Sequence, residues 1–297
     1  MPHPKPEPKL RLASALSRRA VLAGCGALAA CGKPGDKPPP AGANMTLAQA
    51  VAGEWRTPAD KARDAWRHPA ESLAFWGLTP GATVVEFWPG AGWYTDIIAP
   101  YLAATGGKLY AADLQPDPAD PASGAIVEAY RKRLRDKPRL YGDVEITAFG
   151  PTSGPVAPAG SADLVLFLRN LHNWMAAGLA EKAFRDAFAA LKPGGALGIE
   201  EHRADPGGVQ DVLAASGYVQ QAYAMALAKE AGFVFDKASE INANPKDTKD
   251  HPFGVWTLPP VRRASARGEP DDPGFDHAKY DAVGESDRMT LRFVKPG

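Results

Sequence analysis

Short runs of β-branched and other apolar residues alternate along the chain with segments of helical spacing. In one such segment Phe184, Ala187, Phe188 and Leu191 recur at i, i+3, i+4 and i+7, and Lys192-Pro193-Gly194-Gly195 follows as a helix-end signal. The predicted strands are Thr83–Trp88, Lys108–Asp113, Val144–Ala148, Asp163–Leu168, Ala196–Glu201, Phe233–Ala238 and Met289–Val294. This alternation predicts right-handed βαβ units and a mostly parallel sheet with helices on both faces.

Two stretches lie outside this alternation. The amphipathic stretch Thr46–Trp76 precedes the first strand, and its helices would either cap an active site or pack on the sheet. Residues from about 241 to 286 are rich in Pro, Asp and Gly, which predicts an irregular insertion outside the sheet. Within it we expect Asp247, Lys249 and Asp250 to form a solvated run of charges.

The charge balance limits the class of partner. Lys plus Arg and Asp plus Glu both total 34, so the chain has no net charge at pH 7. Proteins that bind nucleic acid through bulk electrostatics carry a basic excess. We therefore expect no nucleic-acid partner.

A glycine turn after the first predicted strand indicates a ligand without phosphate. Gly90 and Gly92 let the backbone approach a ligand closely, but position 95 is threonine where a dinucleotide fingerprint needs a third glycine. Glu86 would repel a pyrophosphate and suits an ammonium group, whereas Asp113, at the end of the second strand, suits ribose hydroxyls. A ribose, a positive charge and no phosphate are the features of S-adenosylmethionine (SAM).

Four motifs occur in the order typical of one family. Glu86-x-x-x-Gly90-x-Gly92, Asp113, Ala162–Leu166 and Leu191–Gly195 resemble the motif series of class I SAM-dependent methyltransferases. The resemblance covers about residues 45–295, and WPGAGWY, RNLHNW and GESDRMTLRFVKP narrow it to a bacterial group of predicted methyltransferases. It implies a Rossmann-like α/β fold with a mostly parallel seven-stranded sheet, an antiparallel last strand and SAM as cofactor.

One position departs from that family. Trp88 stands where the family usually has another glycine, so we expect its indole to narrow the methionine end of the pocket or to stack near it.

The loop after the fourth predicted strand carries the candidate catalytic residue. His172-Asn173-Trp174 is similar to the His-Asp-Trp of small-molecule O-methyltransferases, in which the histidine is the base, although Asn173 replaces the acidic residue. The alternative is that His172 bonds the loop backbone and Trp174 packs in the core. Asn170 is a candidate contact to the cofactor loop. Oxygen is favoured as the methylated atom because an NPPY-type sequence is absent.

Glu200-Glu201-His202-Arg203 ends the fifth predicted strand and contains residue types that bind metals. Neighbouring strand residues point to opposite faces, so at most two of the four would converge. We expect an ion pair or a substrate contact there and no metal site.

Three functions compete on these residues. The first is methyl transfer from SAM to a small-molecule acceptor. The second is a non-catalytic module that binds SAM or another nucleoside, and the third is a nicotinamide reductase, which Thr95 and Glu86 argue against.

The N-terminus resembles a twin-arginine export signal. Arg18-Arg19 precede a weakly apolar run from Ala20 to Ala30, which is far shorter than the roughly 20 residues that span a bilayer. Cys25 and Cys31 each end a lipoprotein-like box, and Cys31 is the better candidate; an ordinary cleaved signal is the alternative. Residues 32–44 read as a Pro/Gly tether. The chain is thus expected to be an exported, membrane-anchored lipoprotein, with a cytoplasmic location as the alternative.

Cys31→Ser should move the protein from the membrane fraction to a soluble fraction, since acyl chains at this residue would hold it by about 0.8 kcal/mol per buried methylene. Cys25→Ser is the matched control and should leave the distribution unchanged. An unmodified Cys31 in the mass spectrum of the native protein would contradict the lipid anchor.

Overall fold

The computed structural model describes residues 45–297. The expected export signal, the tether, Cys25 and Cys31 lie outside the described residues. The strands are β1 (Thr83–Phe87), β2 (Lys108–Leu114), β3 (Val144–Phe149), β4 (Ala162–Leu168), β5 (Leu191–His202), β6 (Val234–Ser239) and β7 (Arg288–Val294). The helices are α1 (Leu47–Val51), α2 (Pro58–Ala62), α3 (Asp64–Arg67), α4 (Pro69–Trp76), α5 (Thr95–Thr105), α6 (Pro121–Asp136), α7 (Pro138–Tyr141), α8 (Leu171–Ala176), α9 (Ala180–Ala190), α10 (Gln221–Glu230), the 3₁₀ helix η1 (Gly254–Thr257) and α11 (His277–Asp281).

All seven strands form one sheet in the order β3-β2-β1-β4-β5-β7-β6. The first five are parallel, and β7 runs antiparallel to both β5 and β6. The predicted Rossmann-like α/β fold is therefore confirmed, including the antiparallel last strand. The direction of the strand order reverses between β1 and β4, and in open parallel sheets ligands bind beyond the carboxyl ends of the strands at such a point.

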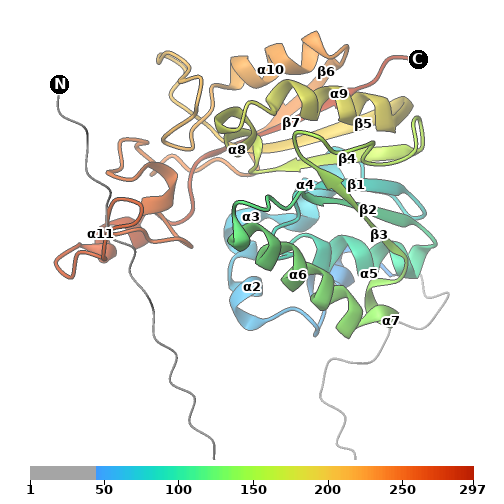
Figure 1. Ribbon diagram of the computed structural model, residues 1–297, viewed down its shortest axis with the longest axis horizontal. Coiled ribbons are helices and arrows are strands. Elements are labelled where there is room, and N and C mark those ends of the chain that lie inside the picture. The colour runs from blue at the N-terminus through green and yellow to red at the C-terminus, as the bar shows by residue number, and fades with distance from the viewer. Residues whose placement is uncertain (1–44) are drawn as a thin grey trace, which may run out of the picture. The chain divides into compact units, whose positions relative to one another are not determined.

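Strand alternation divides the apolar side chains into two cores. Odd-numbered residues of β1, such as Val85 and Phe87, face a core that includes Trp174 of α8 and Phe184 of α9. Val84 faces the other core, which α1, α4, α5, α6 and α7 complete. Figure 1 shows α8, α9 and α10 together near the top of the view, and α5, α6 and α7 below. The helices thus cover both faces, as predicted.

The N-terminal helices pack on the sheet. Trp76, the last residue of α4, is fully buried against Gly198 of β5, and the Arg292 Nε of β7 donates to the Trp76 carbonyl at 3.0 Å. The same segment reaches the candidate site, as described below. Packing on the sheet, one of the two roles that the sequence suggested for residues 46–76, is therefore present.

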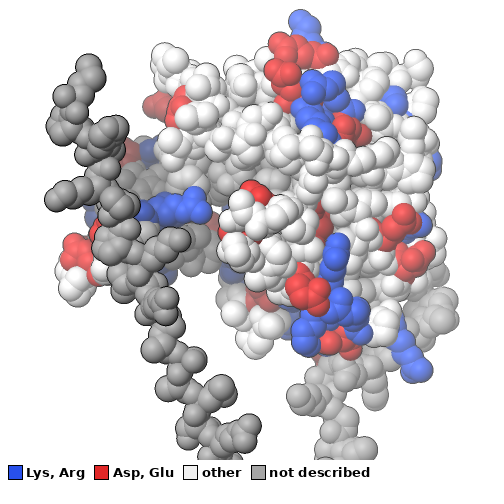
Figure 2. All heavy atoms as spheres, in the orientation of Figure 1, with Lys and Arg blue, Asp and Glu red and all other residues white. Residues whose placement is uncertain are grey.

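The stretch between β6 and β7 is mostly irregular. Between positions 241 and 286, η1 and α11 are the helices that the structure describes. This segment, orange to red in Figure 1, extends beside the ends of the strands. On the face that Figure 2 shows, acidic and basic side chains lie next to one another. No helix in the described part of the chain combines the length and the apolar character needed to cross a membrane.

A matched pair of substitutions tests the packing of α4 on the sheet. A Cβ at Gly198 would lie 2.5 Å from Trp76 Cγ, so Gly198→Ala should lower the free energy of unfolding by about 1–3 kcal/mol through overpacking. Gly124, inside α6, has no described atom within 4 Å of such a Cβ, so Gly124→Ala should be neutral or stabilising by up to about 1 kcal/mol. Urea denaturation measures both, and equal effects would contradict this packing.

Candidate functional site

The candidate site lies where β1, β2, β4 and β5 end. Three non-helical residues of the turn after β1 have positive φ angles, namely Trp88 (44°), Gly90 (57°) and Gly92 (82°). A Cβ at Gly90 would have no atom of residues 45–297 within 4 Å, so this glycine borders open space. A Cβ at Gly92 would lie 3.3 Å from Arg133 Cδ and 3.4 Å from a Tyr130 ring carbon. Gly90 is therefore placed to let a ligand approach, whereas Gly92 lets α6 approach the turn.

Glu86 points away from that open space, toward α5. Its Oε2 accepts a hydrogen bond from Thr95 Oγ1 at 2.7 Å, and Tyr130 Oη lies 3.1 Å from the same hydroxyl. Burial raises the pKa of the Glu86 carboxyl to about 7, and the nearby Asp96 and Asp113 charges add to the rise. The threonine that replaces a third glycine therefore holds the acidic residue of the turn.

Arg133 of α6 clamps the turn from outside. Its Nη1 donates to the Ala91 carbonyl at 3.0 Å, and its Nε donates to Asp96 Oδ1 at 2.9 Å. Tyr141 Oη donates to the same Asp96 oxygen at 2.7 Å. The turn is thus fixed by side chains from two helices before any ligand binds.

Asp113 has the acceptor capacity that the sequence predicted. It is 1% exposed, and its Oδ1 accepts the Leu114 amide at 2.8 Å. Its Oδ2 has no hydrogen-bond partner among residues 45–297. Burial raises the pKa of the carboxyl to about 6. A buried acceptor without a partner is costly, so this oxygen indicates a ligand with hydroxyl or amino donors.

Trp88 and Asn170 hold the turn from the side of β4. The Trp88 Nε1 donates to the Phe149 carbonyl at 2.9 Å, and its ring packs against Phe149 and Trp174. Asn170 Nδ2 lies 3.0 Å from the Trp88 carbonyl and 3.4 Å from that of Phe87. Asn170 therefore contacts the turn backbone, and the indole is anchored in the core beside the turn.

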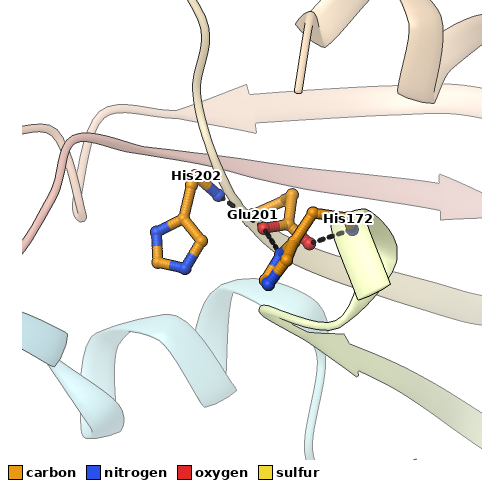
Figure 3. Close-up of side chains that lie close together, drawn as sticks. All are labelled: His172, Glu201 and His202. Carbon is orange, nitrogen blue, oxygen red and sulfur yellow. Dashed lines mark hydrogen bonds and ion pairs between the residues drawn. The ribbon is translucent and has the colours of Figure 1, made fainter. Parts of the chain in front are cut away.

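His172 is paired with a carboxylate that sequence reasoning did not assign to it. The His172 Nδ1 lies 2.9 Å from Glu201 Oε1, and Glu201 Oε2 accepts the backbone amides of Leu171 at 2.6 Å and of His172 at 3.3 Å. Figure 3 shows His172 at the start of α8 facing Glu201 at the end of β5. A carboxylate at Nδ1 keeps the proton on that nitrogen, so Nε2 is left as the basic atom.

Glu201 and His202 converge with His172, and Glu200 points to the opposite face. Ligand-type atoms of the three lie within 4.8 Å of one another, which is close enough to hold a metal ion. However, Glu201 is also bonded by the His202 amide at 2.8 Å, and His202 Nδ1 lies 2.5 Å from Ser286 Oγ. Burial, together with the His172, Arg288 and Arg169 charges, lowers the pKa of His202 well below its usual value. We interpret the cluster as an oriented base beside a neutral imidazole, since the hydrogen bonds already occupy the carboxylate.

A cavity of about 230 Å³ adjoins this cluster. Its lining includes the polar side chains of His172, His202, Arg67 and Arg169 and the apolar ones of Trp256, Pro259 and Pro260. The Trp256 ring centroid lies 5.9 Å from that of His172. The cavity can therefore hold a small molecule against the basic nitrogen.

The sequence analysis assigned no role to Arg67 or Arg169, and it named Glu201 only as part of a possible ion pair or substrate contact. Arg169 and Glu201 stand at the ends of predicted strands, which was the available signal, whereas Arg67 lies in no motif that the sequence analysis quotes. The expectation for Asp247 was wrong: it is 5% exposed and accepts hydrogen bonds from Tyr218 Oη and the Asp287 amide. A charge run in a Pro/Asp/Gly-rich loop conceals such tertiary partners.

Comparison with known proteins identifies the fold. No protein-family model matches the sequence, and no curated protein matches it significantly. Among solved structures, the [4+2]-cyclase SpnF is similar at 16% identity over 84% of this chain and 91% of its own, with a TM-score of 0.53. A Galdieria sulphuraria protein named as a sarcosine dimethylglycine methyltransferase is similar at 15% identity over 80% and 88%, with a TM-score of 0.50. The chain has the class I methyltransferase fold. The cyclase among these structures shows that the fold alone does not identify the reaction.

The raised pKa of Asp113 predicts how pH affects stability. The folded state favours the protonated carboxyl. The contribution of Asp113 to the free energy of unfolding is therefore complete below about pH 4 and is lost as the pH rises through about 6. As the pH rises from about 4 to about 6, Asp113→Asn should therefore gain free energy of unfolding relative to the parent by about 1.4 kcal/mol per pH unit. Urea denaturation at several pH values measures the difference. The exposed Asp143 is the control, and a difference that does not change with pH would contradict the raised pKa of this buried carboxyl.

Proposed function

We propose that the protein transfers a methyl group from SAM to a small-molecule acceptor, with an acceptor oxygen favoured. The observation that carries the proposal is the unpartnered Asp113 Oδ2 at the carboxyl end of β2, beside a turn that Gly90 leaves open. The fold supports methyl transfer in general. The preference for oxygen as the acceptor atom rests on the geometry of His172.

The residues present fit SAM. Asp113 Oδ2 supplies the free acceptor that a ribose hydroxyl requires, and a charged carboxylate makes hydrogen bonds of about twice the usual strength. Gly90 removes the Cβ that would fill the approach to the turn. Glu86 is buried and bonded to Thr95, so it supports the turn from β1 and makes no direct contact with the open space beside Gly90. When bound, SAM supplies an electrophilic methyl group on a sulfonium ion.

His172 supplies the base. Its Nε2 removes the proton from an acceptor hydroxyl, and Glu201 at Nδ1 stabilises the imidazolium that results. Glu201 itself is fixed by the Leu171, His172 and His202 amides, so the imidazole is oriented before the acceptor binds. His202, with its lowered pKa, stays neutral and does not compete for the proton.

The alternative is an exported protein with this fold that binds SAM or another nucleoside without turnover. The cytoplasmic origin of SAM favours it if the N-terminal signal is used. We also propose export through that signal, with a lipid anchor at Cys31. Binding and turnover therefore need separate measurements.

Calorimetry tests the cofactor. The protein should bind SAM and S-adenosylhomocysteine but not NAD, and Asp113→Ala should weaken SAM binding by about tenfold or more through loss of a charge-assisted contact. Gly90→Val should weaken it by filling the open approach. SAM binding that is unchanged in both variants would show that the cofactor site lies elsewhere.

Turnover tests the base. Formation of S-adenosylhomocysteine should be measured with a panel of small hydroxy compounds, and His172→Ala should lower the rate by about 10²-fold or more with SAM affinity nearly unchanged. Added imidazole should restore part of that rate, and Glu201→Gln should lower it because the orientation and charge at Nδ1 change. SAM binding without turnover by the parent would favour the binding module, and an unaltered rate in His172→Ala would make His172 structural.

A further inference from the structure

The cavity beside His172 carries an unusual amount of buried positive charge. Arg67 and Arg169 line it, and shared carboxylates link them to two further arginines; we call the four the arginine cluster: Arg63, Arg67, Arg169 and Arg288. Glu285 pairs with Arg63 at 2.8 Å, with Arg67 at 2.9 Å and with Arg288 at 2.8 Å. Glu200 lies 3.0 Å from Arg169 and 3.2 Å from Arg288. Two carboxylates thus serve four guanidinium groups.

The net charge of the arginine cluster and its carboxylates stays positive when the pair formed by His172 and Glu201 is included. Glu201 adds a third carboxylate, which leaves an excess of one positive charge when both cavity histidines are neutral. The side chains of Arg288, Arg67 and Arg169 are 1%, 6% and 15% exposed, whereas that of Arg63 is 25% exposed. Arg63 is the member that reaches solvent, so the buried guanidinium groups and the three carboxylates balance, and the free donors of the two arginines that line the cavity are what indicate a further anion.

The two members of the arginine cluster that line the cavity have hydrogen-bond donors without an acceptor in the described chain. The Nε of Arg67 donates to Glu285, and its Nη1 and Nη2 have no acceptor among residues 45–297. Arg169 has its Nη1 in an ion pair with Glu200, and its Nε and Nη2 have no acceptor among those residues. A guanidinium with two free donors matches a carboxylate bidentately.

Both guanidinium groups are held in place. Arg67 stacks over the Trp93 ring with 4.7 Å from its guanidinium carbon to the ring centroid, and Arg169 lies 5.7 Å from the Tyr94 centroid. Arg169 also has a φ angle of 58°, and its amide donates to the Glu200 carbonyl at 2.7 Å. A non-glycine residue in this strained conformation persists where the surroundings fix it, and such residues gather at functional sites.

The size and the remaining wall of the cavity complete the description of the ligand. A volume of about 230 Å³ lies below the roughly 300–1,000 Å³ of typical ligand pockets, so the ligand is small. Trp256, Pro259 and Pro260 offer an apolar surface on which a hydrocarbon or aromatic body can pack.

We propose that the acceptor is a small hydroxy acid whose carboxylate binds Arg67 and Arg169, whose apolar body packs against Trp256, and whose hydroxyl meets His172. This inference rests on the proposed function, which it deepens by naming the substrate class. The carboxylate accepts from the unpartnered donors of both guanidinium groups, and these two contacts turn the hydroxyl toward the base.

Calorimetry with matched acids and amides tests the proposal on the full-length protein. The probes are lactate, salicylate and 4-hydroxybenzoate, each compared with its neutral amide. At least one acid should bind about tenfold or more tightly than its amide, and high salt should reduce the preference only modestly because the site is buried. Binding of acid and amide with equal affinity, or no binding of any acid at millimolar concentration, would overturn the proposal.

Substitutions show which residues cause the preference for the acid over its amide. Arg67→Met leaves Glu285 paired with Arg63 and Arg288, so the fold should survive while the preference for the acid falls about tenfold. Arg169→Met should do the same, and Arg169→Lys should keep part of the preference if only the charge matters. The exposed Arg185→Met of α9 is the control and should change nothing. An acid preference retained in both Arg67→Met and Arg169→Met would overturn the assignment of the carboxylate site.

SAM binding and recognition of the acid can be tested separately. SAM affinity measured in the same samples should stay near that of the parent in Arg67→Met. If the acids bind selectively but SAM does not, the proposed function fails and the anion site stands. If SAM binds and the acids show no preference, the substrate class fails and the proposed function stands.

Discussion

The alternation of side chains at the end of β5 holds the candidate site together. Neighbouring residues of a strand point to opposite faces, so Glu200 faces Tyr94, Arg169 and Arg288, whereas Glu201 faces His172 at the start of α8. One strand end thus supports both the arginine cluster and the catalytic pair. A shift of the register of β5 by a single residue would exchange the two carboxylates and disconnect both systems.

The site has two halves of opposite electrostatic character. Around the glycine turn, Glu86 and Asp113 are buried carboxyls with raised pKa values, and one oxygen of Asp113 has no partner in the described chain. Around the cavity, Arg67 and Arg169 carry donors that have no acceptor in the described chain. A cationic ligand with hydroxyl donors fits the first half and a small acid fits the second. In the proposed reaction this separation places the two reactants at different ends of one site.

The sequence predicted what depends on local pattern. The strands, the helix that contains Phe184, the glycine turn and Asp113 are signalled by periodicity or by position at a strand end. The pairing of His172 with Glu201 depends on the register of β4 with β5, in which Leu168 lies opposite Glu200, and no local pattern encodes it. The ion pair of Arg67 with Glu285 joins residues 218 positions apart. Such contacts follow from the packed fold, so the sequence alone indicated the residues around the glycine turn better than those around the cavity.

The central claim is that Asp113 accepts hydrogen bonds from SAM in its ionised form. Because the pKa of this carboxyl is about 6 before binding, binding near pH 5 must be accompanied by proton release. Calorimetry of SAM binding in two buffers of different ionisation enthalpy measures the number of protons released. The account predicts release of about one proton near pH 5, little release near pH 8, and loss of the Asp113 share in Asp113→Asn. Absence of SAM binding, or binding near pH 5 with no proton released, would contradict it.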